Sequence, residues 1–294
     1  MKKIKLVTHD NRFHSDDVFA TATLLLMLKD KEFEIIRTRD NKVIESADFV
    51  YDVGGIYDEE NNRFDHHQEG KVGERENGIP YSSFGLIWKK FGTEVCGLKD
   101  IADMLDKKIV QPIDILDNGM SLSKPIHEGI RPYIINDIVS AFDPSWPEDQ
   151  DFDGLFLRAV EMAKWILERE IIRAQDVEKA RGSLEEIYNK TEDKRIIILE
   201  ENYPWENILN KYPEPLFVVK TRGEGGWSIK AVRDDMYSFE YRSYFPESWA
   251  GKRGEELSEI TGVEGSIFCH NARFICAAKS KEGAIKLAKI ALNN

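Results

Sequence analysis

The sequence predicts an α/β protein of two domains: a larger one with a parallel sheet flanked by helices, and a smaller mixed α/β domain. Three observations support this fold class. The 294 residues exceed the usual size of one hydrophobic core. Strand-like apolar runs alternate with helix-like segments in the first half, which is typical of a parallel sheet. Near residue 192 the pattern changes and strand-like runs predominate, so we expect domains at residues 1–192 and 193–294.

The first domain opens with three predicted strands and one helix. The segment 4-IKLVTH-9 reads as a short buried strand. Ser15, followed by two aspartates, fits a helix N-cap with acidic first-turn residues, and the helix should run toward Lys29. Strand-length apolar runs follow at 33-FEIIRT-38 and 47-ADFVYDV-53.

The remainder of the first domain is predicted to be mainly helical. A glycine-containing loop over residues 70–78 precedes an amphipathic helix, and residues 98–116 show a helical pattern again. The stretch 141-AFDPSWPEDQD-151 has two prolines and an acidic run, which predicts a loop or lid. Residues 154–190 have helical periodicity and form one long helix or two.

Four apolar runs of the second domain have the length and composition of strands. They are 195-RIIILE-200, 216-LFVVK-220, 227-WSIKAVR-233 and 273-RFICAA-278. A closing helix is expected over residues 281–292. Gly225 and Gly226 fit a hairpin turn and equally fit a close backbone approach to a phosphate, so both interpretations stay open.

Composition limits the class of protein and its partners. A net charge of −12 repels nucleic acid at long range, so a polyanionic substrate needs a local basic surface or metal ions. The run 24-LLLML-28 is too short to span a bilayer, and the N-terminus lacks a signal-peptide pattern. We therefore expect a cytoplasmic protein without a membrane partner. Three cysteines without CxxC spacing argue against a disulfide framework and a thiolate zinc site.

Histidines and carboxylates gather in four separate segments. Four of the six histidines lie in 8-THDNRFHSDD-17 and 64-FDHHQ-68, Asp52 ends a predicted strand, and 114-DILDNG-119 adds two aspartates. Ligands in open α/β sheets collect at the carboxyl ends of strands. Carboxylates and neutral imidazoles that converge there suit metal chemistry on phosphate. One such residue alone is more often structural, but the joint pattern favours a metal site.

Taken in order, the motifs HxxxxHxD, D, DHH and DNG resemble the DHH phosphoesterase superfamily, and in detail its melanocyte-proliferating-gene family of metal-dependent hydrolases. The matching pieces span nearly the whole chain. They are 8-THDNRFHSDD-17, 64-FDHHQ-68, 82-SSFGLIWKKFG-92, 112-PIDILDNG-119, 142-FDPSW-146, 239-FEYR-242, 249-WAGKRGEEL-257 and 268-FCHNARF-274. This chain departs from the family at Asn11, usually Gly, and at Lys252, usually Leu.

The resemblance implies a DHH-like fold that holds two divalent metal ions. His9 and His14 would hold one ion, and Asp16 and His66 the other. Asp52 would bridge both ions. Asp117 would complete the second site, although whether Asp114 or Asp117 is the fourth-motif ligand stays open. His14 replaces an aspartate of most superfamily members, so manganese is favoured and zinc, cobalt or iron become alternatives.

The resemblance also assigns roles to the rest of the DHH motif. His67 would lie over the substrate phosphate, and Asp65 would orient a histidine and fix its tautomer. With Asp52, these two residues form the expected catalytic set. The second domain, expected to close over the cleft, has seven Lys or Arg against five Asp or Glu between Lys220 and Arg253, interleaved with aromatic residues that include Tyr237. The residues expected to contact substrate are Arg242, Trp249, Arg253 and His270, although a solvated strand face would explain any one of them.

The function that the resemblance implies is metal-dependent phosphodiester hydrolysis, most concretely a 3′–5′ exonuclease acting on RNA or short oligonucleotides. Two metal ions would activate the attacking water. The alternatives are a small-nucleotide phosphatase, a cyclic-dinucleotide phosphodiesterase, and a non-catalytic nucleotide-binding protein with a structural metal. HExxH is absent, which argues against a metallopeptidase. Composition leaves a homodimer open.

Overall fold

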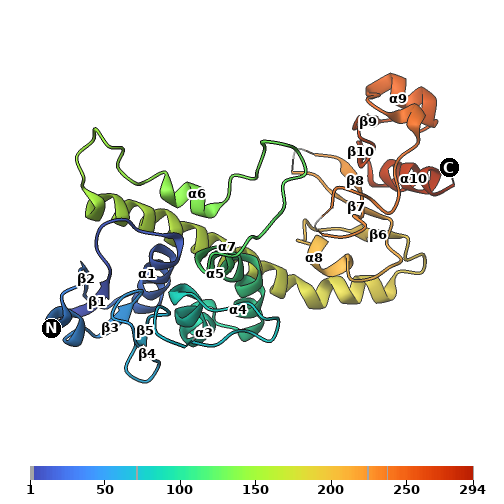
Figure 1. The fold of residues 1–294 in the computed structure, drawn as a ribbon. Coiled ribbons are helices and arrows are strands. Elements are labelled where there is room, and N and C mark those ends of the chain that lie inside the picture. The colour runs from blue at the N-terminus through green and yellow to red at the C-terminus, as the bar shows by residue number, and fades with distance from the viewer. Residues whose placement is uncertain (1–2, 71, 224, 237, 294) are drawn as a thin grey trace. The chain divides into compact units, whose positions relative to one another are not determined.

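The computed structural model describes residues 3–70, 72–223, 225–236 and 238–293 (Figure 1). The described residues form two compact units, which comprise residues 1–174 and 175–294. The boundary between these units falls inside a long helix, whereas the boundary expected from sequence lies just beyond that helix, near residue 192. The fold is α/β in both units, as predicted, with strands and helices in each.

Among the described residues, the first unit contains a sheet of five strands in the order β2-β1-β3-β5-β4. The strands are β1 Ile4–Thr8, β2 Phe33–Arg37, β3 Phe49–Tyr51, β4 Tyr57–Asp58 and β5 Arg63–Phe64. All neighbours pair in parallel except β4, which is antiparallel to β5. The sheet predicted to be parallel is therefore mixed. A short connection after Asp58 returns the chain directly, and such a hairpin can join only antiparallel strands.

The two faces of this sheet belong to different apolar clusters, because side chains alternate along each strand. Leu6, Tyr51 and Phe64 lie in the main core, together with apolar residues of the helices that follow. Val7 and Val50 point to the other face. There they pack with residues of α2, which spans Asn41–Glu45 and was not expected from the sequence.

Helix α1, Ser15–Leu28, starts one residue earlier than predicted, because its N-cap is His14 and not Ser15. The carboxylate of Asp17, at the third helical position, accepts the backbone N–H of His14 at 2.8 Å. Most of α1 is buried on all sides, including both aspartates of its first turn. A helix with this burial fixes its neighbours precisely, since little of it can shift into solvent.

The helical predictions for the rest of the first unit are confirmed in outline. Helix α3 spans Ser83–Cys96. Residues 98–116 form α4 Lys99–Leu105, a π-helical turn Asp106–Val110 and α5 Gln111–Asp117. Helix α6, Ile135–Ser140, was not expected. Residues 141–151 lack regular secondary structure, as predicted for a loop.

Helix α7, Phe152–Lys190, is a single helix of 39 residues. Phe156, Ala163 and Leu167 of its first part are buried in the core of the first unit. Leu184 and Tyr188 of its last part belong to an apolar cluster of the second unit. Although this helix is long, no helix among the described residues is apolar enough over a sufficient length to cross a membrane.

The second unit holds another mixed sheet, in which the described strands number five and follow the order β6-β7-β8-β10-β9. They are β6 Ile196–Leu199, β7 Phe217–Thr221, β8 Trp227–Ala231, β9 Ser266–Cys269 and β10 Ile275–Ala278. The helical segments are α8 Glu206–Leu209, η2 Glu247–Trp249, α9 Gly254–Thr261 and α10 Lys281–Leu292. Four of these strands and α10 match the sequence prediction, whereas β9 was missed.

The glycines between β7 and β8 form a hairpin turn. Arg222 N–H donates to the carbonyl of Gly226 at 3.1 Å, and both Gly225 and Gly226 have positive φ. A Cβ on Gly226 would lie 2.7 Å from the carbonyl oxygen of Ala278. Turn geometry and this close approach therefore account for the glycines. The three cysteines are buried, and none of them is in a disulfide.

Candidate metal centre

The carboxyl ends of three neighbouring parallel strands bring the motif residues to one edge of the first sheet. His9 follows β1, Asp52 follows β3, and Asp65 follows β5. The order β1-β3-β5 makes these strands adjacent. His66 and Asp16, in the first turn of α1, complete the inner part of the edge. Topology therefore places side chains that are far apart in sequence within reach of one another.

Short distances connect these side chains around Asp52. His9 Nε2 lies 3.2 Å from Asp52 Oδ2, and His66 Nε2 lies 3.5 Å from Asp52 Oδ1. His66 Nε2 also lies 3.2 Å from Asp117 Oδ2 and 4.0 Å from Asp16 Oδ2. These distances suit groups that can share a small cation, because each offers a nitrogen or oxygen lone pair.

Four groupings of possible metal ligands occur within the part of the chain that the structure describes. They are His9–His14–Asp52, Asp52–His66–His67, His14–Asp16–Asp117 and Asp16–Asp17–Asp52. In each grouping the ligand atoms lie within 4.8 Å of one another. Asp52 belongs to three of the four, so it holds the central position that a bridging carboxylate needs. All six residues expected to bind metal therefore occur in one constellation.

Asp16 provides the clearest sign that a cation belongs here. The residue is fully buried, and neither of its carboxylate oxygens finds a hydrogen-bond donor among the described residues. Burying a carboxylate without a partner costs several kcal/mol, so such groups in proteins are normally paired or bind a metal. The nitrogen and oxygen donors around Asp16 fit a first-row divalent ion.

The pKa values of the cluster show the same need for positive charge. Burial raises the pKa of Asp16 well above its usual range, and the charges of Asp117 and Asp52 raise it further. Burial opposes protonation of His66, but the adjacent carboxylates of Asp117 and Asp52 prevail and raise its pKa to about 10. Protons thus supply the charge that divalent ions would supply, and metal binding would release them.

In its neutral form, the histidine after β1 presents its Nε2 lone pair to the cluster. His9 Nδ1 lies 3.0 Å from the carbonyl oxygen of Asp10. Because a carbonyl can only accept, Nδ1 must carry the proton, which leaves Nε2 as an acceptor in the neutral ring. This backbone contact orients the ring in the way that metal-binding histidines usually require.

Two residues of the site adopt left-handed backbone conformations that are uncommon outside glycine. Asp52 has φ of +54° and Asn11 has φ of +64°. Strain of this kind is concentrated at functional sites, where the surrounding structure maintains it. Asparagine tolerates this region better than most residues. This explains how Asn11 can occupy a position where the resemblance implies glycine.

Asp65 orients His67 and not the inner histidine of the pair. Its carboxylate accepts hydrogen bonds from Gly55 N at 2.6 Å, His67 N at 3.0 Å and His67 Nδ1 at 2.8 Å. These bonds hold the pKa of Asp65 below its usual range, although burial opposes them. The His67 ring is 63% exposed. Since Nδ1 is engaged, its Nε2 is the atom left for a substrate.

Asp117, and not Asp114, faces the cluster. Asp117 Oδ2 approaches His66, whereas Asp114 is fully buried and accepts from Ser82 Oγ at 2.6 Å. Residues three apart on a helix share a face, so the difference lies in their partners: Asp114 is held by Ser82 and Arg75, whereas Asp117 approaches His66. In this structure, Asp117 is therefore the aspartate of the fourth motif that faces the cluster, and Asp114 is not.

Two further residues touch the centre without having been expected there. Asp17 caps α1 through one oxygen, while its Oδ2 lies 3.4 Å from His9 Nε2. Ser83 Oγ donates to Asp52 Oδ1 at 3.4 Å. In the sequence, Asp17 belongs to an acidic pair in the first turn of a predicted helix. Helix capping alone explains such a pair, so it did not mark Asp17 as part of the centre. No local pattern marks Ser83.

The residues expected to contact substrate occupy different environments in the second unit. Arg242 donates to the backbone carbonyls of Asn210, Tyr212 and Pro215, and Trp249 is 3% exposed within the core. Arg253 and His270 are exposed. The side chains of Arg242 and Trp249 therefore have structural partners, whereas those of Arg253 and His270 are accessible to solvent. Tyr237 lies outside the described residues.

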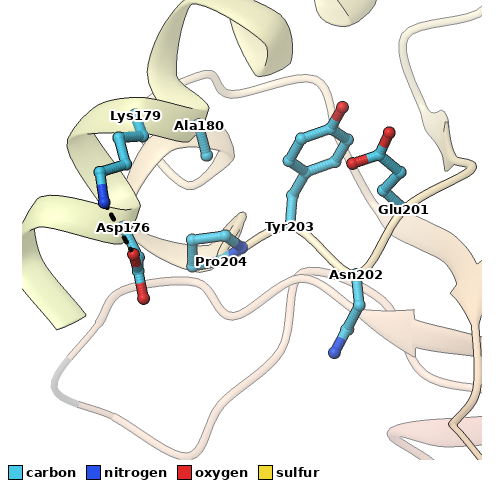
Figure 2. A pocket seen from close by; sticks show the side chains of 7 residues that line it. All are labelled: Asp176, Lys179, Ala180, Glu201, Asn202, Tyr203 and Pro204. Carbon is cyan, nitrogen blue, oxygen red and sulfur yellow. Dashed lines mark ion pairs between the residues drawn. The ribbon is translucent and has the colours of Figure 1, made fainter. Parts of the chain in front are cut away.

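The second unit contains a cavity of about 250 Å³, shown in Figure 2. It is lined by Asp176, Lys179, Ala180, Glu201, Asn202, Tyr203 and Pro204. Lys179 pairs with Asp176 at 3.6 Å, and the described lining residues include none of those predicted from sequence. Among the described residues, the groupings of possible metal ligands lie in the first unit.

Comparisons with known proteins place this constellation in context. A family profile described as MYG1_exonuc, an uncharacterised protein family (UPF0160), matches residues 5–292. The MYG1 protein of Dictyostelium discoideum is 32% identical over 100% of this chain and 98% of its own length. The MYG1 exonuclease of Homo sapiens is 30% identical, over 98% and 85%. The MYG1 protein of Chlamydia pneumoniae is 31% identical, over 98% and 96%. No solved structure gives a significant match.

Proposed function

Because this chain belongs to the MYG1 family, we propose that it is a metal-dependent phosphodiester hydrolase, a 3′–5′ exonuclease acting on RNA or short oligonucleotides. Relatives that bear the name MYG1 exonuclease support the nuclease class. The ordered motifs support a place in the DHH phosphoesterase superfamily. The single observation that carries the chemistry is the fully buried Asp16, whose carboxylate faces imidazoles and carboxylates and lacks a donor among the described residues.

The proposed centre holds two divalent ions, with manganese favoured and zinc, cobalt or iron as alternatives. His9, His14 and Asp52 would bind one ion, and Asp16, His66 and Asp117 would join Asp52 around the other. When bound, such ions lower the pKa of a shared water and offset the charge that develops on a phosphoryl group. Imidazole and carboxylate donors in one site suit these borderline metals.

The chain itself contributes positioning and proton transfer. His67 is held by Asp65 through Nδ1, which also lies 3.5 Å from Asp52, so its Nε2 is the atom left to donate a hydrogen bond or a proton to a phosphoryl or leaving-group oxygen. Arg253 and His270 of the second unit are the proposed contacts for the rest of the substrate, because an exposed guanidinium and an exposed imidazole N–H can donate hydrogen bonds to phosphate.

Hydrolysis of labelled RNA tests this function. Protein stripped with EDTA and reloaded with Mn²⁺ should shorten a 5′-labelled single-stranded RNA stepwise, which gives a ladder of labelled products. Immediate release of labelled mononucleotide would show the opposite polarity. If the protein hydrolysed a cyclic dinucleotide or a nucleoside monophosphate and left RNA intact, its substrate would be a small nucleotide and not RNA. If no phosphate ester is cleaved with Mn²⁺, Zn²⁺, Co²⁺ or Fe²⁺, the enzyme proposal fails.

A further inference from the structure

A buried ionic network lies next to the metal centre in the first unit. Arg75 Nη1 lies 2.7 Å from Asp114 Oδ2, and the Arg75 side chain is 9% exposed while that of Asp114 is fully buried. The same guanidinium donates Nε and Nη2 to the two oxygens of Asp106, at 3.1 and 2.7 Å. One arginine therefore joins two carboxylates on successive helical segments, the π-helical turn and α5, through the planar fork of donors of its guanidinium.

Polar side chains complete the network on both sides of the arginine. Ser82 Oγ donates to Asp114 Oδ1 at 2.6 Å, and Gln111 Nε2 donates to Asp106 Oδ2 at 2.6 Å. Tyr81 stacks under the guanidinium, whose carbon lies 4.2 Å from the ring centroid. A buried network of this kind is stable only while each member keeps its partners, so it restrains every element that contributes to it.

Both ends of the network continue directly into the metal centre. Ser82 is the N-cap of α3, and the next residue, Ser83, donates to Asp52. Asp114 lies nearly one turn before Asp117 on α5, and Asp117 faces His66. The distance between the carboxylates of Asp52 and Asp117 therefore depends on how the start of α3 is held against α5.

The packing leaves the Asp114 carboxylate no room to move toward α3. A Cβ placed on Gly85, in the first turn of α3, would lie 2.1 Å from Asp114 Oδ2. Any side chain at this position would push the carboxylate away from Arg75 and Ser82. The absence of a side chain at Gly85 therefore allows Asp114 to contact Arg75 and Ser82.

We propose that Arg75 and Asp114 are positioning residues, which hold α3 and α5 together so that Asp52 and Asp117 present oxygens to the same cation. The inference rests on the proposed function, because it takes the cluster as a metal centre. Neither residue touches the metal-facing atoms, and both act through the residues that follow Ser82 and Asp114. Asp106 and Gln111 fix the arginine itself.

Manganese binding to the Asp114→Asn and Arg75→Lys variants tests the proposal. In Asp114→Asn, the amide oxygen can still accept a hydrogen bond from Ser82, but the amide N–H groups then face the N–H groups of Arg75. In Arg75→Lys, the single ammonium group cannot bind Asp106 and Asp114 together. Each variant should bind Mn²⁺ about 10- to 100-fold more weakly at one of two sites, which is the usual cost of losing a group that orients ligands. Isothermal titration and the Mn²⁺ electron paramagnetic resonance spectrum report this without an activity assay. Gly85→Ala should weaken binding in the same way.

A control separates positioning from stability alone. Glu168→Gln removes the partner of Lys164 on α7, in the same unit but outside the network, and should leave Mn²⁺ affinity unchanged. If Asp114→Asn lowers the thermal unfolding temperature but binds Mn²⁺ like the wild type, the positioning role is refuted and the proposed function stands. If Asp114→Asn does not fold, Ser82→Ala decides, because it removes one hydrogen bond only: weaker binding supports the role and unchanged binding overturns it. If the wild type binds no divalent ion, the proposed function and this inference fall together.

Discussion

Replacing Asp52 with asparagine should abolish high-affinity binding of both divalent ions and lower RNA hydrolysis by about a thousandfold or more. Asp52 faces His9 with one oxygen and His66 with the other. An amide retains the size of the side chain but removes the charge and replaces one of these oxygens with a donor. Metal ions contribute several kcal/mol of transition-state stabilisation, and each 1.4 kcal/mol corresponds to about tenfold in rate.

The Asp52→Asn experiment requires the metal content and the rate to be measured on the same preparation. Metal analysis after dialysis against Mn²⁺ gives the stoichiometry, and labelled RNA gives the rate. Asp103→Asn is a suitable control, since Asp103 is an exposed acid paired with Lys99. The control should keep its metal and activity. Two retained ions together with full activity in Asp52→Asn would remove Asp52 from the centre.

Replacing His67 with alanine should lower hydrolysis about 100- to 10,000-fold, the usual contribution of a general acid or base, while Mn²⁺ stoichiometry stays at the wild-type value. The reason is geometric: Asp65 engages Nδ1, so the exposed ring can act on a substrate through Nε2. Asp65→Asn should give part of the same loss, because the asparagine amide can also stabilise the wrong tautomer of His67.

Single-turnover kinetics distinguish this role from metal binding. The rate of cleavage should fall in His67→Ala, whereas the concentration of Mn²⁺ required for half-maximal rate should not change. His127→Ala removes an exposed histidine distant in sequence from the motif and should behave like the wild type. Loss of one metal ion from His67→Ala would assign His67 as a ligand, in agreement with its grouping with Asp52 and His66.

The sequence placed the candidate metal ligands in segments that the structure brings together, in part because strand ends meet at one edge of a sheet. His9 and Asp52 end apolar runs, and the carboxyl ends of neighbouring parallel strands must meet at one edge. It could not choose between Asp114 and Asp117, since the choice depends on which way α5 is turned against α3. Asp114 pairs with Arg75, which is far from α5 in sequence and carries no local signal.

The remaining differences have similar physical causes. Strands β4 and β5 contain two residues each, too few for an alternating pattern to be visible. Arg242 and Trp249 belong to residue types that serve a binding surface or a core equally well. Only the surrounding carbonyl groups of Arg242 and the burial of Trp249 distinguish the two uses. The residue types in a sequence indicate which contacts a side chain can make, but only the structure shows whether that side chain is buried or exposed.

Anomalous scattering from crystals soaked in manganese tests the central claim most directly. The account predicts two anomalous peaks on either side of Asp52, one beside His9 and His14 and the other beside His66, Asp16 and Asp117. Absence of any peak at saturating Mn²⁺, or peaks that avoid Asp52, would contradict it.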